Sequence, residues 1–297
     1  MKLSNDIITI EVAEHGAELI SLQRYGREYL WTGDAAYWNR HAPILFPAVG
    51  KPYNNELHID GEVYPMKQHG FARDSEFEPK YTRRHNSLRL CMKPGSLSDN
   101  YPYRLGLEVC YHLDDNKVEV MWVVKNHDER EAYFQIGAHP GFLLPEYQNT
   151  DEIHGYIRYF DREGKEVRPV IVNGLEEGNR VPLTEPLHVD SLMPLTKDTF
   201  AHDALMFEGG QVTKTELWDK YLTSPILSVS CPQAEAYGIW APHKPGCPFV
   251  CLEPWCGICD THGFTDNISR RQYIHRLAPN ETYTFTYIIK LYPLPAR

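Results

Sequence analysis

A glutamate and a histidine interrupt two of the most apolar stretches of the chain. Glu253 stands in FVCLEPWCGICD and His139 stands in FQIGAHPGF. A carboxylate in such surroundings costs free energy unless it is paired, and burial raises its pKa toward that of a general base. Histidine exchanges protons near neutral pH. The two residue types therefore indicate acid–base chemistry, with a structural ion pair of Glu253 and a backbone-bonded His139 as the alternatives.

Three further stretches place polar side chains inside apolar or aromatic sequence. They are YWNRHAPILFPAVG with Arg40, MKQHGFARD with His69 and Arg73, and HDALMF with Asp203. Each has a structural alternative: a surface arginine, a capped turn or a turn aspartate. Together with Trp255 beside Glu253, these residues offer the donors, acceptors and rings of a site for a neutral polar ligand. A sugar fits that description.

Strands are the elements that must position these residues, because apolar residues alternate with polar ones along much of the chain. The alternation runs through Ile8–Val12, Leu105–Leu113, Val118–Val124 and Tyr283–Leu291. Asp114, Asp115 and Asn116 between two of these runs predict a hairpin turn. The pattern predicts an all-β fold, a large antiparallel β-sandwich with few short helices.

Two segments depart from this alternation. Residues 192–200 carry a loose helical spacing of apolar residues, which predicts a short helix. Residues 172–187 (VNGLEEGNRVPLTEPL) are polar and contain Pro and Gly, which predicts a long surface loop. No stretch is typical of a linker, so residues 1–297 are expected to form a single domain.

Composition excludes several classes of function. The chain has 297 residues and a formal net charge of −10, which disfavours nucleic acid and anionic membranes as partners. No stretch has the apolar length of a membrane span. The first residues lack the apolar core of a secretory leader, so we expect a cytoplasmic protein. A monomer and a homodimer are both compatible with the sequence.

Four of the seven cysteines crowd into one segment, and they are Cys247, Cys251, Cys256 and Cys259, with His262 close by. A structural zinc site normally joins two separated pairs of ligands, and only one C-x-x-C occurs here. We therefore expect no metal, and interpret these cysteines as reduced thiols that pack as small hydrophobic residues.

Taken in order, these motifs resemble those of the aldose 1-epimerase, or galactose mutarotase-like, superfamily. The similarity begins at GAELISLQRYGREYLW and continues through RHAPILFPAVG, QHGFARDSEF, GAHPGF, HDALMF and PFVCLEPWCGICD. Each motif alone is weak evidence, but together they follow the family's order across nearly the whole chain. The bacterial mutarotase-like branch, related to the hexose-6-phosphate 1-epimerases, is the most similar. The resemblance implies a β-sandwich with a sugar site in an open cleft of one sheet.

The resemblance also implies a reaction and its residues. The reaction interconverts the α and β anomers of an aldose and needs no cofactor. Glu253 corresponds to the base that takes the proton from the anomeric hydroxyl, and His139 to the acid that protonates the ring oxygen. His69 corresponds to a second histidine near that oxygen, and Arg40 and Asp203 to contacts with sugar hydroxyls.

Departures from the galactose mutarotase pattern leave alternatives open. The HGFAR form around His69 resembles the hexose-6-phosphate epimerases, whose arginine contacts the phosphate, so Arg73 could bind a sugar phosphate. A non-catalytic carbohydrate-binding homologue is a second alternative. A glycoside hydrolase with Glu253 and Asp203 as its carboxylate pair is a third.

Overall fold

The computed structural model describes residues 1–93 and 101–293. Its longest strands are β10 (Leu105–Asp114), β11 (Lys117–Asn126) and β25 (Thr282–Leu291), and in each of them buried residues alternate with more exposed ones. Each strand thus packs one face on the core. The predicted hairpin turn is confirmed, because β10 and β11 pair antiparallel up to Asp114 and Lys117.

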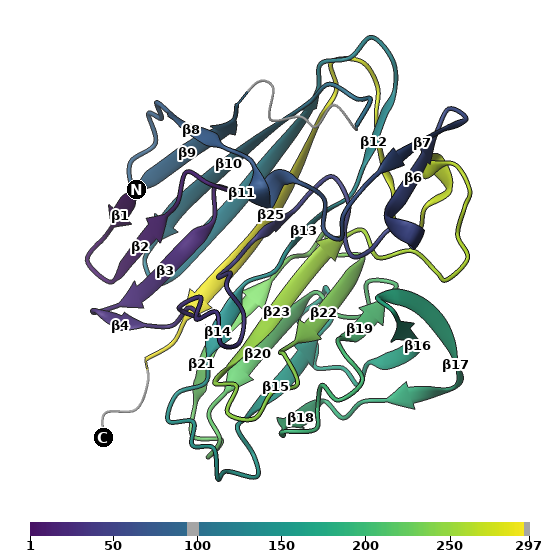
Figure 1. The fold of residues 1–297 in the computed structure, drawn as a ribbon. Coiled ribbons are helices and arrows are strands. Elements are labelled where there is room, and N and C mark those ends of the chain that lie inside the picture. The colour runs from purple at the N-terminus through teal and green to yellow at the C-terminus, as the bar shows by residue number, and fades with distance from the viewer. Residues whose placement is uncertain (94–100, 294–297) are drawn as a thin grey trace.

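A nine-stranded antiparallel sheet forms one layer, in the order β18-β15-β20-β21-β25-β11-β10-β9-β8 (Figure 1). Its remaining strands are β8 (Phe77–Lys80), β9 (Ser87–Met92), β15 (Gly155–Phe160), β18 (Leu192–Leu195), β20 (Lys214–Trp218) and β21 (Pro225–Ser230). Trp122 on β11 and Phe285 on β25 are paired across the sheet, and their buried rings stack with centroids 5.0 Å apart.

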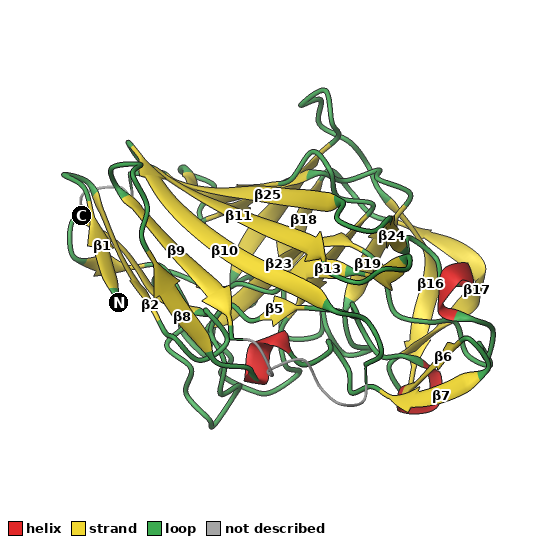
Figure 2. Ribbon diagram, turned by 90° about the horizontal axis from the view of Figure 1, so that it is seen from above, coloured by secondary structure: helices red, strands yellow, loops and turns green. Residues whose placement is uncertain are grey.

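A six-stranded sheet forms the second layer (Figure 2). Its strands are β5 (Ile44–Leu45), β13 (Ile136–Ala138), β14 (Gly141–Leu143), β19 (Leu205–Glu208), β22 (Ala236–Trp240) and β23 (Phe249–Cys256). Buried side chains join the layers: the hydroxyls of Thr215 on β20 and Tyr237 on β22 lie 2.8 Å apart. The rings of Tyr159 on β15 and Phe207 on β19 meet with centroids 5.0 Å apart. The predicted antiparallel β-sandwich is confirmed.

Smaller sheets and short turns complete the chain. The small sheets are formed by β1 (Lys2–Ser4), β2 (Ile8–Val12), β3 (Leu19–Arg24) and β4 (Arg27–Glu28), by β6 (Glu56–Ile59) and β7 (Glu62–Pro65), by β12 (Ala132–Phe134) and β24 (His275–Leu277), and by β16 (Val170–Glu176) and β17 (Asn179–His188). The helices of the described residues are the 3₁₀ turns η1 (Tyr53–Asn55), η2 (Ala72–Asp74) and η3 (Ile268–Arg270). Within those residues, no helix has the length and apolar character needed to cross a membrane.

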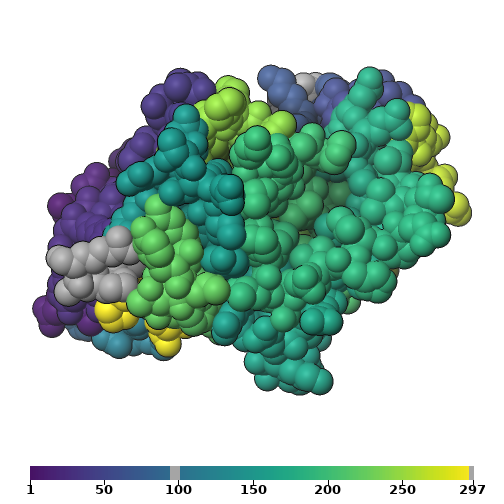
Figure 3. Space-filling view, turned by 90° about the horizontal axis from the view of Figure 1, so that it is seen from below, coloured from purple at the N-terminus to yellow at the C-terminus, as the bar shows by residue number. Residues whose placement is uncertain are grey.

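The two segments that departed from the alternation were predicted wrongly. Residues 192–195 form the edge strand β18 instead of a helix, because they pair with β15. Pro194 is tolerated there, since an edge strand leaves one row of backbone groups unpaired. Residues 172–187 form the β16–β17 hairpin instead of a loop. Most of β17 is exposed, which explains its polar sequence. Seen from below, the blue-green part of the chain, which includes this hairpin, forms the surface opposite the purple N-terminal strands (Figure 3).

Candidate active site

A cavity of about 390 Å³ lies on the six-stranded sheet, on the side away from the nine-stranded layer. The residues predicted from the sequence that line it are His69, Arg73, His139, Asp203, Glu253 and Trp255. These residues come from four separate stretches of sequence, and folding brings them to one place. Arg40 is the exception, because it does not belong to the cavity wall.

Strand β23 positions Glu253 and Trp255. It lies between β22 on one side and β13 and β14 on the other, and all eight of its residues are buried. Because side chains alternate along a strand, Glu253 and Trp255 face the cavity while Leu252 packs into the core. Gly238 on the neighbouring strand makes room for the indole, since a Cβ there would lie 2.4 Å from the Trp255 ring.

His139 occupies the short connection between β13 and β14 and points at Glu253. Its Nε2 lies 3.3 Å from Oε2 of Glu253. The imidazole stacks on Trp38, with ring centroids 4.9 Å apart, and meets the edge of Trp240 at 5.6 Å. These contacts hold the ring at one orientation and remove most of its surface from water.

His69 is held by a strained turn. Its φ is 67° and that of Gly70 is 70°. A Cβ on Gly70 would lie 2.2 Å from the Phe46 carbonyl oxygen, so only glycine fits. The backbone N–H of Gly50 donates to Nδ1 of His69 at 3.1 Å, which leaves the proton of the neutral ring on Nε2. His69 meets His139 edge to face, with centroids 5.5 Å apart.

Burial sets the protonation state of the cleft. Desolvation raises the pKa of Glu253 well above 4.5, nearby Asp203 adds to the shift, and Trp255 opposes it. Desolvation, reinforced by Arg73 and Arg40, lowers the pKa of His139 to about 3. Burial therefore favours a protonated carboxyl and a neutral imidazole at this 3.3 Å contact, a state in which the pair holds one titratable proton. Burial, followed by the neighbouring His139 and then Arg73, also lowers the pKa of His69 well below 6.5.

Four buried polar atoms of the cavity wall make no hydrogen bond, and they are Nε of Arg73, Nδ1 of His139, Oε2 of Glu253 and Nε1 of Trp255. Buried polar atoms are normally hydrogen-bonded, so each of these four atoms remains available to a bound ligand. The set contains donors and acceptors within one cavity. A ligand with several hydroxyl groups, each both donor and acceptor, would complete it.

The two arginines differ in what they contact. Arg73 lines the cavity and donates from Nη2 to the Gln68 carbonyl at 2.7 Å. Burial and the neighbouring Arg40 lower the pKa of Arg73 to about 10. Arg40 instead donates to the Asp74 carboxylate at 2.7 Å and to the Arg73 carbonyl at 3.4 Å. Its predicted contact with a sugar hydroxyl stays a prediction, and its observed contacts support the turn that carries Arg73.

The cavity wall also contains residues that the sequence did not single out. Trp38, Gln68 and Trp240 lie there, as do Leu175 and Gly178 near the tip of the β16–β17 hairpin. Trp38 and Gln68 stood inside quoted motifs, but the hairpin carried no signal. Its tip is anchored by a buried ion pair of 2.7 Å between Arg180 and Glu208. Asn179 donates to the Lys51 carbonyl at 2.9 Å.

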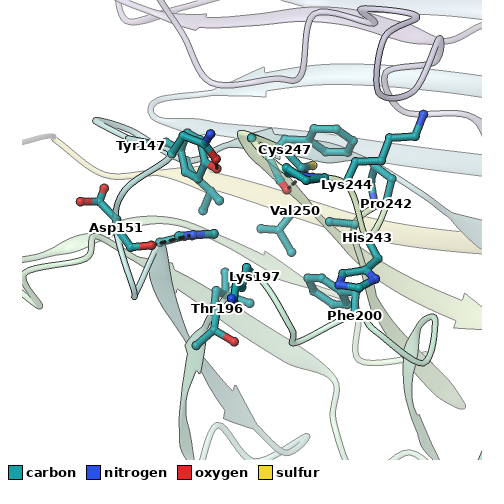
Figure 4. A pocket seen from close by; sticks show the side chains of 18 of the residues that line it. Tyr147, Asp151, Thr196, Lys197, Phe200, Pro242, His243, Lys244, Cys247 and Val250 are labelled. Atoms are coloured by element: carbon teal, nitrogen blue, oxygen red, sulfur yellow. Dashed lines mark hydrogen bonds between the residues drawn. The ribbon is translucent and has the colours of Figure 1, made fainter.

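A second cavity, of about 240 Å³, is lined in part by Phe249 and Val250 of β23 (Figure 4). Leu144, Leu195, Phe200 and Val250 supply apolar side chains to its lining. Three of the charged and imidazole residues that line it have partners among neighbouring residues: Asp151 accepts from Lys220 at 2.6 Å, Nε2 of His154 lies 3.2 Å from the Asp151 carbonyl, and Lys244 donates to the Ala36 carbonyl at 3.2 Å. The first cavity is therefore the better candidate for an active site.

The sandwich and the cavity on its six-stranded sheet define a galactose mutarotase-like protein. The profile of the family named Aldose 1-epimerase matches residues 1–290. The chain therefore belongs to the aldose 1-epimerase family.

Individual relatives agree with this assignment. The plasmid-encoded protein LacX of Lactococcus lactis is 26% identical over 301 residues, which cover 98% of this chain and 99% of LacX. A galactose mutarotase related enzyme from Lactobacillus acidophilus superposes with a TM-score of 0.86 at 26% identity, covering 99% of this chain and 97% of its own. A galactose mutarotase-like protein from Lactobacillus casei gives a TM-score of 0.85 at 25% identity, covering 98% and 99%.

Replacing Glu253 with glutamine should stabilise the protein. The folded state binds the Glu253 proton more tightly than the unfolded chain, so folding stability is lost as pH rises above 4.5 toward the raised pKa. Glu253→Gln removes this titration. We expect its melting temperature to exceed that of the wild type by a margin that widens from about pH 5 to about pH 9.

Differential scanning calorimetry across this range measures the margin. Glu62→Gln on exposed β7 is the matched control and should follow the wild type at every pH. Parallel curves for Glu253→Gln and the wild type would contradict a raised pKa for Glu253.

Proposed function

We propose that this protein is an aldose 1-epimerase that interconverts the α and β anomers of a hexose through acid–base ring opening. The observation that carries the proposal is the Glu253–His139 pair, 3.3 Å apart in a cavity of unpartnered polar atoms. Opening a hemiacetal requires a base at O1 and an acid at O5, which are bonded to the same carbon. One carboxyl and one imidazole in contact are suited to serve both oxygens at once.

The single proton of the pair matches the two stages of the reaction. When the closed sugar is bound, Glu253 acts as carboxylate and His139 as imidazolium. Transfer from O1 to Glu253 and from His139 to O5 opens the ring. The pair is then a protonated carboxyl and a neutral imidazole, which is the state favoured by burial. After rotation about C1–C2, the reverse transfers close the ring on the other face, and no proton is gained or lost.

Sugar hydroxyls must supply the free energy that ionises the pair before ring opening. A hydroxyl that donates to Oε2 of Glu253 stabilises the carboxylate, and one that accepts from His139 stabilises the imidazolium. Oε2 of Glu253 and Nδ1 of His139 make no hydrogen bond within the protein, so both are available to the sugar. Trp38 and Trp240 offer apolar faces for the C–H groups of a pyranose, and Asp203 offers a carboxylate at the exposed side of the cavity.

The comparisons support this class of activity. The family is named for aldose 1-epimerases, and two solved relatives with TM-scores of 0.86 and 0.85 carry galactose mutarotase in their descriptions. Hexose-6-phosphate 1-epimerase is the second candidate, because Nε of Arg73 is buried in the cavity wall without a hydrogen bond, and its nearest carboxylate oxygen, on Asp74, is 4.0 Å away. An enzyme of this kind would prefer glucose 6-phosphate to glucose, and Arg73→Gln would remove that preference.

Substitution of the acid–base pair tests the reaction directly. Glu253→Gln and His139→Asn should each slow catalysed mutarotation roughly 10²–10⁴-fold, and His69→Asn less, because a positioned acid or base contributes about that much. Polarimetry of fresh α-D-glucose, α-D-galactose and α-D-glucose 6-phosphate in dilute buffer measures the rates.

The same experiment separates the alternatives. A non-catalytic carbohydrate-binding homologue would leave the spontaneous rate unchanged in the wild type with every sugar, although it binds one of them. A Glu253→Gln variant as fast as the wild type would refute the role given to Glu253. Release of a reducing sugar from a glycoside would indicate a hydrolase instead.

The pH dependence of kcat/KM provides a further test, because it reports the groups of the free enzyme. The pKa of His139 lies at about 3 instead of its usual 6.5, so no inflection is expected near pH 6.5. The rate should instead fall at alkaline pH, where the pair loses its one proton. A profile that rises or falls through pH 6.5 would show that His139 titrates normally.

A further inference from the structure

A second group of chemically active side chains lies away from the sugar cleft. It consists of Glu235, just before β22, Cys256 at the end of β23, and His275 at the start of β24. Cys256 follows Trp255, so its side chain points to the opposite face of the strand from the cleft. One donor atom from each residue lies within 4.8 Å of the other two.

We propose that Glu235, Cys256 and His275 bind a divalent transition-metal ion, with Zn²⁺ as the preferred occupant. A thiolate, an imidazole and a carboxylate are the three side-chain ligand types that zinc uses. The thiolate disfavours Mg²⁺ and Ca²⁺, which prefer oxygen ligands. Three protein ligands leave a fourth position for water, as in open tetrahedral sites.

The contact between Glu235 and His275 has the geometry of two ligands of one ion. Oε2 of Glu235 and Nε2 of His275 are 3.2 Å apart, yet both are buried and neither makes a hydrogen bond. Two ligand atoms at about 2.0–2.1 Å from a tetrahedral ion are separated by about 3.3 Å. A metal ion would satisfy both atoms, whereas their direct contact satisfies neither.

The thiol and its surroundings are suited to the third ligand. Cys256 now donates to the Gln233 carbonyl at 3.1 Å. Metal binding would replace that proton, which leaves to solvent as the sulfur–metal bond forms. The Tyr283 hydroxyl lies beside the sulfur and can donate to the thiolate. The Tyr283 ring also packs on His275, with centroids 4.6 Å apart, which orients the imidazole.

An ion can reach this position from solvent. The side chains of Glu235 and His275 retain 35% and 19% of their exposure. The ligands Cys256 and His275 flank the segment of residues 257–274, which carries the buried Asp260–Arg271 ion pair. A bound ion would therefore fasten both ends of this segment to the six-stranded sheet and stabilise the folded protein.

Cobalt(II) provides the test, because it substitutes for zinc and has a visible spectrum. The chelator-treated full chain should bind one equivalent of Co²⁺ with a thiolate-to-cobalt charge-transfer band and strong visible bands of four-coordination. Zn²⁺ should displace the cobalt and raise the melting temperature. Cys256→Ser should lose the charge-transfer band and the stabilisation.

Cys251→Ser is the matched control. Cys251 lies on the same strand but groups with His139 and Glu253 instead of with Glu235 and His275. The cobalt spectrum should survive this change, and His275→Gln, which keeps the thiol, should abolish stoichiometric binding. Absence of a charge-transfer band in the wild type, or a band lost in Cys251→Ser and kept in Cys256→Ser, would overturn the proposal. Neither outcome bears on the epimerase assignment, which polarimetry tests separately.

Discussion

Desolvation of the Glu253 carboxyl is the constraint on which the rest of the site depends. Strand β23 carries this side chain in the middle of a sheet, with all its residues buried. Burial consequently favours the protonated form of this carboxyl and the neutral form of His139 beside it. A fold selected for stability alone would replace such a group with an apolar one. In this cleft the costly carboxyl lies 3.3 Å from His139, where a proton can pass between the two side chains.

The walls of the cleft also contain features that fix geometry and add little to stability. The Arg180–Glu208 ion pair is buried, and it anchors the tip of a hairpin whose outer strand is exposed. A buried ion pair adds little net stability but fixes geometry, because an alternative arrangement would leave a charge unpaired. The strained turn at His69 likewise fixes the position of a side chain at a cost in stability. These features keep the wall in place around the acid–base pair.

Period-two alternation was sufficient to predict the sandwich, because strands such as β10 and β25 bury one face. Glu253 and His139 were recognisable because each interrupts apolar sequence. The β16–β17 hairpin was missed because a ribbon exposed to solvent has no apolar alternation. The contact of Arg40 with Asp74 depends on loop geometry, which the sequence does not encode locally. The grouping of Glu235 with Cys256 and His275 likewise requires the register of three strands.

Infrared difference spectroscopy of the carboxyl stretch reports directly on the proton of Glu253, since it separates protonated from ionised carboxyl groups. We expect a protonated carboxyl band at neutral pH in the sugar-free wild type that is absent from Glu253→Gln. Addition of the substrate should diminish this band as the pair ionises. If the wild type at neutral pH shows no protonated carboxyl band beyond those of Glu253→Gln, then Glu253 is already ionised without sugar. That result would contradict a protonated Glu253 beside a neutral His139.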